Sequence, residues 1–151
     1  MAEQTESSIV IAAPAKEVMA VIADLEAYPE WNDEVKQIEV LSVYDDPDGA
    51  ADERPAEVRF VLDAGAIKDD YTLEYTWDGD DAVRWSLVGE AAVLRQMDGS
   101  YELADQGDGS TSVTYKLAVD VKFPMIGLMK RKAEKVIIDR ALKGLKKRVE
   151  S

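Results

Sequence analysis

The chain has 151 residues, of which 46% are hydrophobic, and a formal net charge of −13. This length suits one domain, residues 1–151, with a substantial buried core. The chain has no cysteine and no histidine, which excludes disulfides, thiol nucleophiles, histidine-ligated zinc and acid–base chemistry that needs imidazole. No apolar run is long enough for a membrane-spanning helix, and the polar, acidic N-terminus is unlike a secretory signal, so we expect a cytoplasmic protein.

The charge is unevenly distributed along the chain. Residues 124–151 carry nine basic and three acidic side chains, whereas the preceding residues carry nine basic and 28 acidic ones. The strong excess of acidic residues in this larger part of the chain argues against nucleic-acid binding. The basic segment is expected to be the solvated face of a helix that complements its own acidic sheet. The alternative is contact with an anionic membrane or an acidic partner protein.

The first part of the chain predicts one strand followed by two helices. Residues 7–12 are apolar and β-branched, which indicates a strand. Pro14 is expected to open a helix, and Pro29 to interrupt it, because proline lacks the N–H that continues the helical hydrogen-bond ladder. Residues 28–32 then form an aromatic-bearing turn or a short second helix. Two helices at this point are expected to close one end of a sheet.

From residue 35 onward, apolar residues alternate with polar ones, which is typical of strands with one buried face. Six further strands are expected, near residues 35–44, 58–62, 71–77, 83–87, 93–103 and 113–121. An acidic, turn-rich loop covers residues 45–55, and the strings at 78–81 and 106–110 are hairpin signals. Gly99 is a candidate β-bulge.

The last segment, Pro124–Glu150, predicts a long amphipathic helix, since apolar residues recur at helical spacing and proline suits a first turn. We therefore expect an α+β fold in which a seven-stranded, curved antiparallel sheet wraps around this helix. The helix residues expected to face the sheet alternate in size: Met129, Ala133, Ile137, Ala141 and Gly144. Small residues there leave space for a cavity, although a fully packed core fits the same pattern.

Several strings, in this order along the chain, resemble the polyketide cyclase/START-like (SRPBCC) superfamily, the helix-grip fold shared with birch-pollen-allergen-type proteins. They are Ile11–Pro14, Val18–Asp24, Tyr28–Asn32, Gly99–Leu103, Thr111–Tyr115 and Ala141–Lys146. The resemblance covers nearly the whole chain and implies a sheet that grips the C-terminal helix around an apolar cavity. It implies no single activity, because members include lipid carriers, hormone receptors, quinone-binding proteins and aromatase/cyclases.

Aromatic residues on apolar strand faces are the main candidates for ligand contact, because apolar walls with a few hydroxyl or indole donors are typical of small-molecule pockets. They are Tyr71, Tyr75, Trp77, Trp85, Tyr101 and Tyr115. Met97 shares such a face, and Met129, Ala133 and Ile137 are expected to complete the wall from the helix. The alternative is that these are core residues whose polar tips reach the rim.

Arg95 is a charged residue on an otherwise apolar strand face. An unpaired charge is costly in that position, so its guanidinium is predicted to hold a ligand carboxylate or phosphate. The alternatives are a register shift at the turn of residues 89–95, which would expose Arg95, and an internal ion pair with Glu90 or Asp63. Arg140 is similarly ambiguous, because it falls on the apolar stripe of the last helix.

We expect no metal site and no cofactor. The paired carboxylates are expected in turns, where they favour turn formation: Asp45-Asp46, Asp69-Asp70 and Asp80-Asp81. The string Asp78–Asp81 lacks the further ligands of a calcium loop.

The first functional interpretation is non-catalytic binding or carriage of a hydrophobic small molecule, such as a lipid, isoprenoid or polyketide. The second is a polyketide aromatase/cyclase, which would rely on Tyr, Asp, Glu, Arg or ordered water for proton transfer. The third is an adaptor that docks through its basic helix. Either a monomer or a homodimer is compatible with the sequence.

Overall fold

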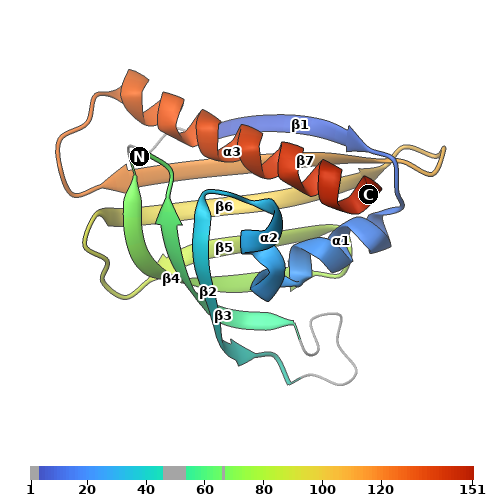
Figure 1. Ribbon diagram of the computed structural model, residues 1–151, viewed down its shortest axis with the longest axis horizontal. Coiled ribbons are helices and arrows are strands. Elements are labelled where there is room, and N and C mark those ends of the chain that lie inside the picture. The colour runs from blue at the N-terminus through green and yellow to red at the C-terminus, as the bar shows by residue number, and fades with distance from the viewer. Residues whose placement is uncertain (1–3, 46–53, 66) are drawn as a thin grey trace.

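The computed structural model describes residues 4–45, 54–65 and 67–151 and confirms the expected α+β helix-grip fold (Figure 1). Its elements are β1 (Thr5–Ile11), α1 (Ala15–Ala23), the 3₁₀ turn η1 (Leu25–Ala27), α2 (Tyr28–Trp31), β2 (Val35–Val43), β3 (Pro55–Asp63), β4 (Lys68–Asp78), β5 (Ala82–Val88), β6 (Leu94–Asp105), β7 (Thr111–Val121) and α3 (Gly127–Glu150). The acidic loop expected at 45–55 falls mostly on residues 46–53, which lie outside the described part.

The seven strands form one antiparallel sheet in the order β1-β7-β6-β5-β4-β3-β2. Strands β2 to β7 pair with their neighbours in sequence, and β1 pairs with β7. The sheet curves around α3, which packs on β1 and β7, while α1 and α2 lie beside the C-terminal half of α3 (Figure 1). Within the described residues, no helix combines the length and apolar character needed to cross a bilayer.

Alternation along the strands determines which side of the sheet forms the core. In β7 every second residue from Thr111 to Val121 is buried, and in β4 the buried set includes Tyr71, Tyr75 and Trp77. Because successive side chains of a strand point to opposite faces, these residues all face α3 and the short helices. Burial of each large apolar side chain contributes roughly 1.5–3 kcal/mol, so the inner face supplies most of the stabilisation.

Gly99 does not form a bulge, because β6 pairs with both neighbours in regular register there. Its role is to make room for the Trp85 side chain. A Cβ atom at Gly99 would lie 2.4 Å from Cε2 of the Trp85 indole, a distance that real carbon atoms do not adopt. The missing side chain therefore allows the indole to lie directly across β6.

Helix α3 begins at Gly127, and its N-cap residue Ile126 has extended backbone angles. The prediction that Pro124 lies in the first turn is therefore wrong, since this proline belongs to the connection after β7. The side chains that α3 buries begin only at Ala133. The first turn and a half of the helix thus has no core beneath it.

Gly144 provides a close approach between α3 and α2. A Cβ atom there would lie 2.2 Å from the backbone carbonyl oxygen of Trp31. The space beside this small residue of α3 is therefore occupied by the end of α2 and is not empty.

Glu134 fastens α3 to the sheet. Its buried carboxylate accepts hydrogen bonds from the Thr5 hydroxyl (2.6 Å) and from the backbone N–H of Val119 (2.7 Å). The pairing of β1 with β7 extends only to Leu117, opposite Thr5, so Glu134 provides the acceptor for a β7 N–H beyond the end of β1. Buried carboxylates need such partners, because an unpaired buried charge is strongly destabilising.

Candidate ligand-binding cavity

An apolar cavity of about 40 Å³ lies between the sheet and α3. Its walls come from α2, α3 and the six strands β2 to β7. They are formed by Tyr28, Asn32, Val35, Phe60, Leu62, Tyr71, Leu73, Tyr75, Trp85, Met97, Tyr101, Tyr115, Ile137 and Ala141. The sheet side carries most of the aromatic rings, because the alternation of β3 to β7 turns them inward.

The rings form a nearly continuous belt across neighbouring strands. Phe60 stacks on Tyr71 with ring centroids 5.6 Å apart, and Tyr75 lies 5.7 Å from Trp85. The belt continues to β7 through the edge-to-face contact of Trp85 with Tyr115, at 5.5 Å. Such offset and edge-to-face pairs add about 0.5–1.5 kcal/mol each beyond simple burial, so this wall is well ordered.

Four tyrosine hydroxyls on the sheet side, from Tyr71, Tyr75, Tyr101 and Tyr115, have no hydrogen-bond partner among the described residues. The Tyr28 hydroxyl, by contrast, donates to the backbone carbonyl of Ile22 at 2.5 Å. In the described part of the chain, Trp31 Nε1 is the only fully enclosed side-chain polar atom without a partner. The four unpartnered hydroxyls are therefore not sealed into the core but reach the space of the cavity.

Burial raises the pKa of all five cavity tyrosines, and for four of them a neighbouring phenol raises it further. Desolvation is the main cause for each, and the Tyr115 phenol is an additional cause for Tyr28, Tyr71, Tyr75 and Tyr101. The ring contacts show how closely these side chains approach, since the Tyr101 and Tyr115 centroids lie 4.7 Å apart. With raised pKa values they stay protonated at neutral pH and act as neutral O–H donors, not as bases or nucleophiles.

Asn32 adds a polar group on the helix side of the cavity. Its side chain is buried, and its Oδ1 atom accepts the backbone N–H of Glu34 at 3.1 Å. Its amide NH₂ has no partner among the described residues, so it is one more donor at the cavity. The polar groups without partners are thus mainly donors, set in walls that are otherwise apolar.

Seven of the predicted contact residues line the cavity: Tyr71, Tyr75, Trp85, Met97, Tyr101, Tyr115 and Ile137. Trp77 and Ala133 are buried but lie outside the lining. Trp77 donates its indole N–H to the Pro55 carbonyl at 2.7 Å, so this polar group has its partner within the protein and needs none from a ligand. The position of these residues at the cavity is observed, whereas their role in ligand binding stays a prediction.

The prediction that Met129 faces the cavity is wrong, because its side chain is 54% exposed. It lies in the first turn of α3, before the stretch that packs on the sheet. The apolar stripe of the sequence continues past the edge of the sheet, and periodicity alone does not reveal where the sheet ends.

The inward placement predicted for Arg95 is also wrong. Its side chain is 61% exposed and pairs with Asp120 at 3.3 Å. The cause is a register shift between Leu94 and Gln96 in the pairing of β6 with β7. Leu94 and Met97 face the core, and the two residues between them face solvent. The alternative of a register shift is therefore correct, whereas Glu90 and Asp63 are not the partners of Arg95.

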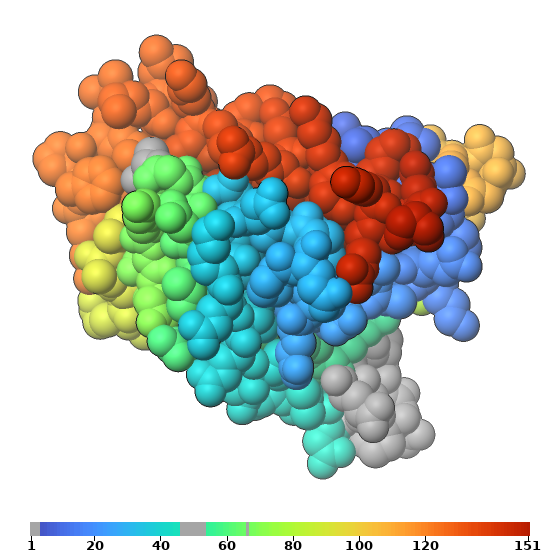
Figure 2. All heavy atoms as spheres, viewed as in Figure 1, coloured from blue at the N-terminus to red at the C-terminus, as the bar shows by residue number. Residues whose placement is uncertain are grey.

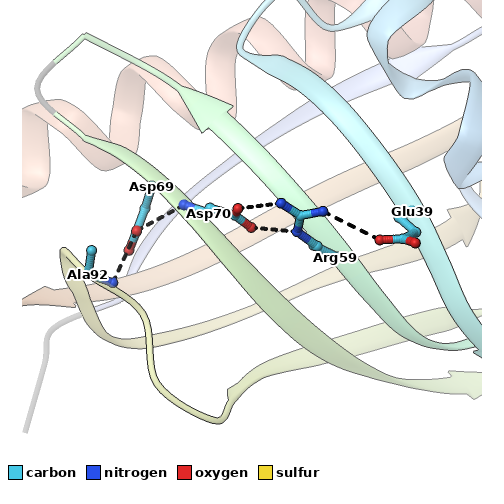
Figure 3. A network of polar contacts seen from close by, with 5 residues as sticks. All are labelled: Glu39, Arg59, Asp69, Asp70 and Ala92. Carbon is cyan, nitrogen blue, oxygen red and sulfur yellow. Dashed lines mark hydrogen bonds and ion pairs between the residues drawn. The ribbon is translucent and has the colours of Figure 1, made fainter.

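Asp69 fixes the start of β6 and hence the position of this shift. Its buried carboxylate accepts hydrogen bonds from the backbone N–H groups of Ala92 (3.2 Å), Val93 (3.0 Å) and Leu94 (2.7 Å). Figure 3 shows the bond to Ala92. Because these bonds hold the chain against β4, Leu94 is the residue that enters the core.

Asp69 and Asp70 both belong to β4, so the prediction that this pair lies in a turn is wrong. Being adjacent on a strand, they point to opposite faces. Asp70 lies on the outer face, where Arg59 donates to both of its carboxylate oxygens and also reaches Glu39 at 3.5 Å (Figure 3). The hydrogen bond from Arg59 lowers the pKa of Asp70.

Arg140 lies at the surface and pairs with the buried carboxylate of Glu34, next to Asn32. Sequence reasoning did not assign a cavity role to Tyr28, Asn32 or Phe60. Tyr28 and Asn32 do belong to one of the strings that carry the family resemblance. Phe60 is marked only by alternation in its strand.

The volume limits what the cavity holds as it stands. About 40 Å³ is enough for a few water molecules, whereas pockets for drug-sized ligands have roughly 300–1,000 Å³. An organic occupant must therefore displace side chains, and the unbranched, flexible Met97 is the lining side chain best able to move.

A comparison with curated proteins found no match. Among solved structures, the chain is similar to a START superfamily protein from Mycobacterium smegmatis, with 24% identity, a TM-score of 0.86 and 97% of each chain covered. A Thermus thermophilus protein has 25% identity and a TM-score of 0.78, covering 98% of this chain and 97% of that one.

The Zhui aromatase/cyclase of a Streptomyces species has 16% identity and a TM-score of 0.77, covering 99% of this chain and 94% of that one. At this identity the likeness concerns the fold alone. Residues 2–150 match the family model described as polyketide cyclase/dehydrase and lipid transport, and the chain therefore belongs to this START-like family.

Proposed function

We propose that this protein binds an apolar, ring-containing small molecule that carries carbonyl or ether oxygens, and that it does so without catalysis. The single observation behind the proposal is the set of four unpartnered tyrosine hydroxyls, Tyr71, Tyr75, Tyr101 and Tyr115, around one aromatic cavity. The family description, which names both polyketide chemistry and lipid transport, supports a hydrophobic ligand of this kind.

The donors determine the ligand chemistry. A buried hydroxyl without a partner costs about 1–3 kcal/mol relative to a paired one. A ligand with acceptor oxygens recovers part of this cost for each hydroxyl it reaches, whereas a pure hydrocarbon recovers none. The aromatic belt then favours flat rings over branched or saturated tails, because flat rings stack on it.

Polyketide aromatase/cyclase activity is the second candidate. The tyrosine O–H groups are suited to polarise a carbonyl, as electrostatic stabilisation of an enolate requires. However, no carboxylate stands among the residues that line the cavity, and Glu34, which lies beside it, is held by Arg140. Because the chain has no histidine, proton transfer in the cavity would fall to a tyrosine or to ordered water. Binding is therefore the better-supported function.

A matched pair of probes tests the proposal. Anthraquinone and anthracene have the same ring shape and differ in two carbonyl oxygens. Binding of each is followed by quenching of tryptophan fluorescence, to which Trp85 at the cavity contributes. We expect anthraquinone to bind more tightly, and Tyr101→Phe and Tyr115→Phe each to reduce that preference by about two- to tenfold, the scale of one hydrogen bond.

Tyr44→Phe is the control, because the Tyr44 hydroxyl donates to the backbone carbonyl of Tyr75 and lies outside the cavity lining. It should leave the preference unchanged. The natural ligand is sought by native mass spectrometry of protein purified from its own host. Equal binding of the two probes by all variants, with no small molecule carried from the host, would contradict the proposal.

A further inference from the structure

Exposed apolar side chains gather at one end of α3. The described part of the chain has seven large hydrophobic residues that are well exposed, and four of them lie within residues 123–129. These four, called the apolar tip below, are Phe123 (42% exposed), Ile126 (63%), Leu128 (70%) and Met129 (54%). In Figure 2 the segment that carries them, drawn in orange, protrudes from the body of the molecule.

The local structure explains why these side chains have nothing to pack against. The connection after β7 leads to the N-cap residue Ile126, whose backbone is extended, and α3 buries no side chain before Ala133. The first turns of the helix therefore project beyond the sheet. An apolar helix surface in this position lowers solubility and contributes nothing to the core, so a binding role explains it better than folding does.

Basic residues surround the apolar tip. Lys130, Arg131 and Lys132 follow it directly, and Lys122 precedes it. Lys130 pairs with Asp120 at 3.4 Å and Lys122 with Glu90 at 2.9 Å, while Lys132 is exposed. Since residues 1–123 carry a large excess of acidic side chains, the positive charge is concentrated on α3.

We propose that the apolar tip docks on an anionic lipid surface. Its four apolar side chains would enter the boundary between headgroups and acyl chains, and the basic residues would lie at the level of the lipid phosphates. The acidic body is repelled by the same surface, which orients the molecule with the tip toward the lipid. This proposal concerns a different surface from the cavity and does not depend on what the cavity holds.

A second copy of the chain is a poorer occupant. A stable protein interface buries about 800 Å² per partner with good shape complementarity, whereas the segment that carries the tip protrudes from the body of the molecule (Figure 2). A fluid lipid surface accepts a protruding apolar group without a complementary pocket.

Co-sedimentation with vesicles tests the proposal on the full chain. The vesicles are phosphatidylcholine alone or phosphatidylcholine mixed with phosphatidylglycerol, each at low and high salt. We expect binding to the anionic vesicles, weak binding to the neutral ones, and loss of binding as salt screens the basic residues. Ile126→Ser/Leu128→Ser should lower the partition coefficient at least tenfold, because two inserted side chains are lost.

The apolar and the basic substitutions each have a matched control, the β2 double variant for the first and Lys147→Glu for the second. Leu41→Ser/Val43→Ser removes two similarly exposed apolar side chains on β2 and should not change vesicle binding. Lys132→Glu should weaken binding by roughly fivefold or more, the scale of one basic residue at a lipid surface. Lys147→Glu makes the same change near the other end of α3 and should have the smaller effect.

Three results would overturn the proposal. The first is no binding of the wild-type chain to either vesicle. The second is an equal loss of binding in the tip and β2 variants. The third is a concentration-dependent dimer in analytical ultracentrifugation that the Ile126→Ser/Leu128→Ser change abolishes without any vesicle binding, which would make the tip an interface between copies. Thermal melts of every variant verify that loss of binding is not loss of folding.

Discussion

Substitution of Gly144 by alanine tests how closely α2 and α3 approach, and this contact holds the helix side of the cavity in place. The new Cβ atom would lie 2.2 Å from the Trp31 carbonyl oxygen and 3.1 Å from Cε3 of its ring. Carbon and carbonyl oxygen normally approach no closer than about 3.3 Å, so the backbone of α2 must retreat by roughly 1 Å. The obstacle is backbone and not a flexible side chain, so the cost cannot be relieved by a rotamer change.

The magnitude follows from two opposing effects. Overpacking costs about 1–3 kcal/mol, and a clash at 2.2 Å with a backbone atom belongs to the upper part of that range, about 2–3 kcal/mol. Replacing glycine by alanine inside a helix returns about 1 kcal/mol. We therefore expect a net loss of about 1–2 kcal/mol in the free energy of unfolding. For a chain of this size that corresponds to a decrease of about 2–8 °C in melting temperature.

The assay is urea unfolding followed by circular dichroism, with melting temperature as a second measure. Gly127→Ala is the matched control, because a Cβ there meets nothing closer than the Arg131 guanidinium at 3.6 Å. It should leave stability unchanged or raise it by a few tenths of a kcal/mol. If Gly144→Ala is as stable as wild type, α2 and α3 do not approach as closely as described, and the assigned position of Asn32 and Tyr28 at the cavity is then wrong.

Two further predictions concern the core. Glu134→Gln should lower the free energy of unfolding in urea by about 2–3 kcal/mol, because a charged acceptor of two hydrogen bonds is lost beneath α3. Glu102→Gln is the control, since Glu102 forms an exposed pair with Lys116. Equal unfolding midpoints for the two variants would refute the role given to Glu134. The five cavity tyrosines have pKa values raised above the usual 10.0, so the folded state keeps protons that the unfolded state releases above pH 10. Stability should therefore be unaffected below that pH and fall above it, and tyrosinate absorbance of the five should rise only as the chain unfolds; their ionisation in the folded state near pH 10 would contradict their burial.

The strands and their inner faces were predictable because one face of the sheet is buried along its whole length. Alternation in β4 and β7 is unbroken, so Tyr71, Tyr75 and Tyr115 could be placed at the core from sequence alone. The same rule failed for Arg95, because a single extra residue between Leu94 and Met97 reverses the faces. The acceptor that fixes this shift, Asp69, lies some 25 residues earlier in the chain, and local patterns carry no information about such a partner.

The helix side was harder to predict for a related reason. Small residues on an apolar stripe indicate either empty space or a close neighbour, and only the tertiary structure decides between them. At Gly144 the neighbour is Trp31. At Met129 the stripe has passed the edge of the sheet, so the same periodicity that buries Ile137 leaves Met129 in solvent.

The two sides of the cavity differ in how firmly they are held. The aromatic rings of β4 to β7 sit on strands that each have two hydrogen-bonded neighbours, and their mutual stacking resists displacement. The opposite side is formed by α2, the start of β2 and α3. Its polar contacts with α3 include two ion pairs: Arg148–Glu30, which reaches α2, and Arg140–Glu34, in the connection between α2 and β2. The Arg148–Glu30 pair is exposed at both ends and holds little energy, so the attachment of α2 to α3 is weaker than the hydrogen-bonded pairing of the strands. A cavity of about 40 Å³ that has to admit an organic ligand is therefore expected to open on the helix side, while the sheet keeps its hydroxyl donors in position.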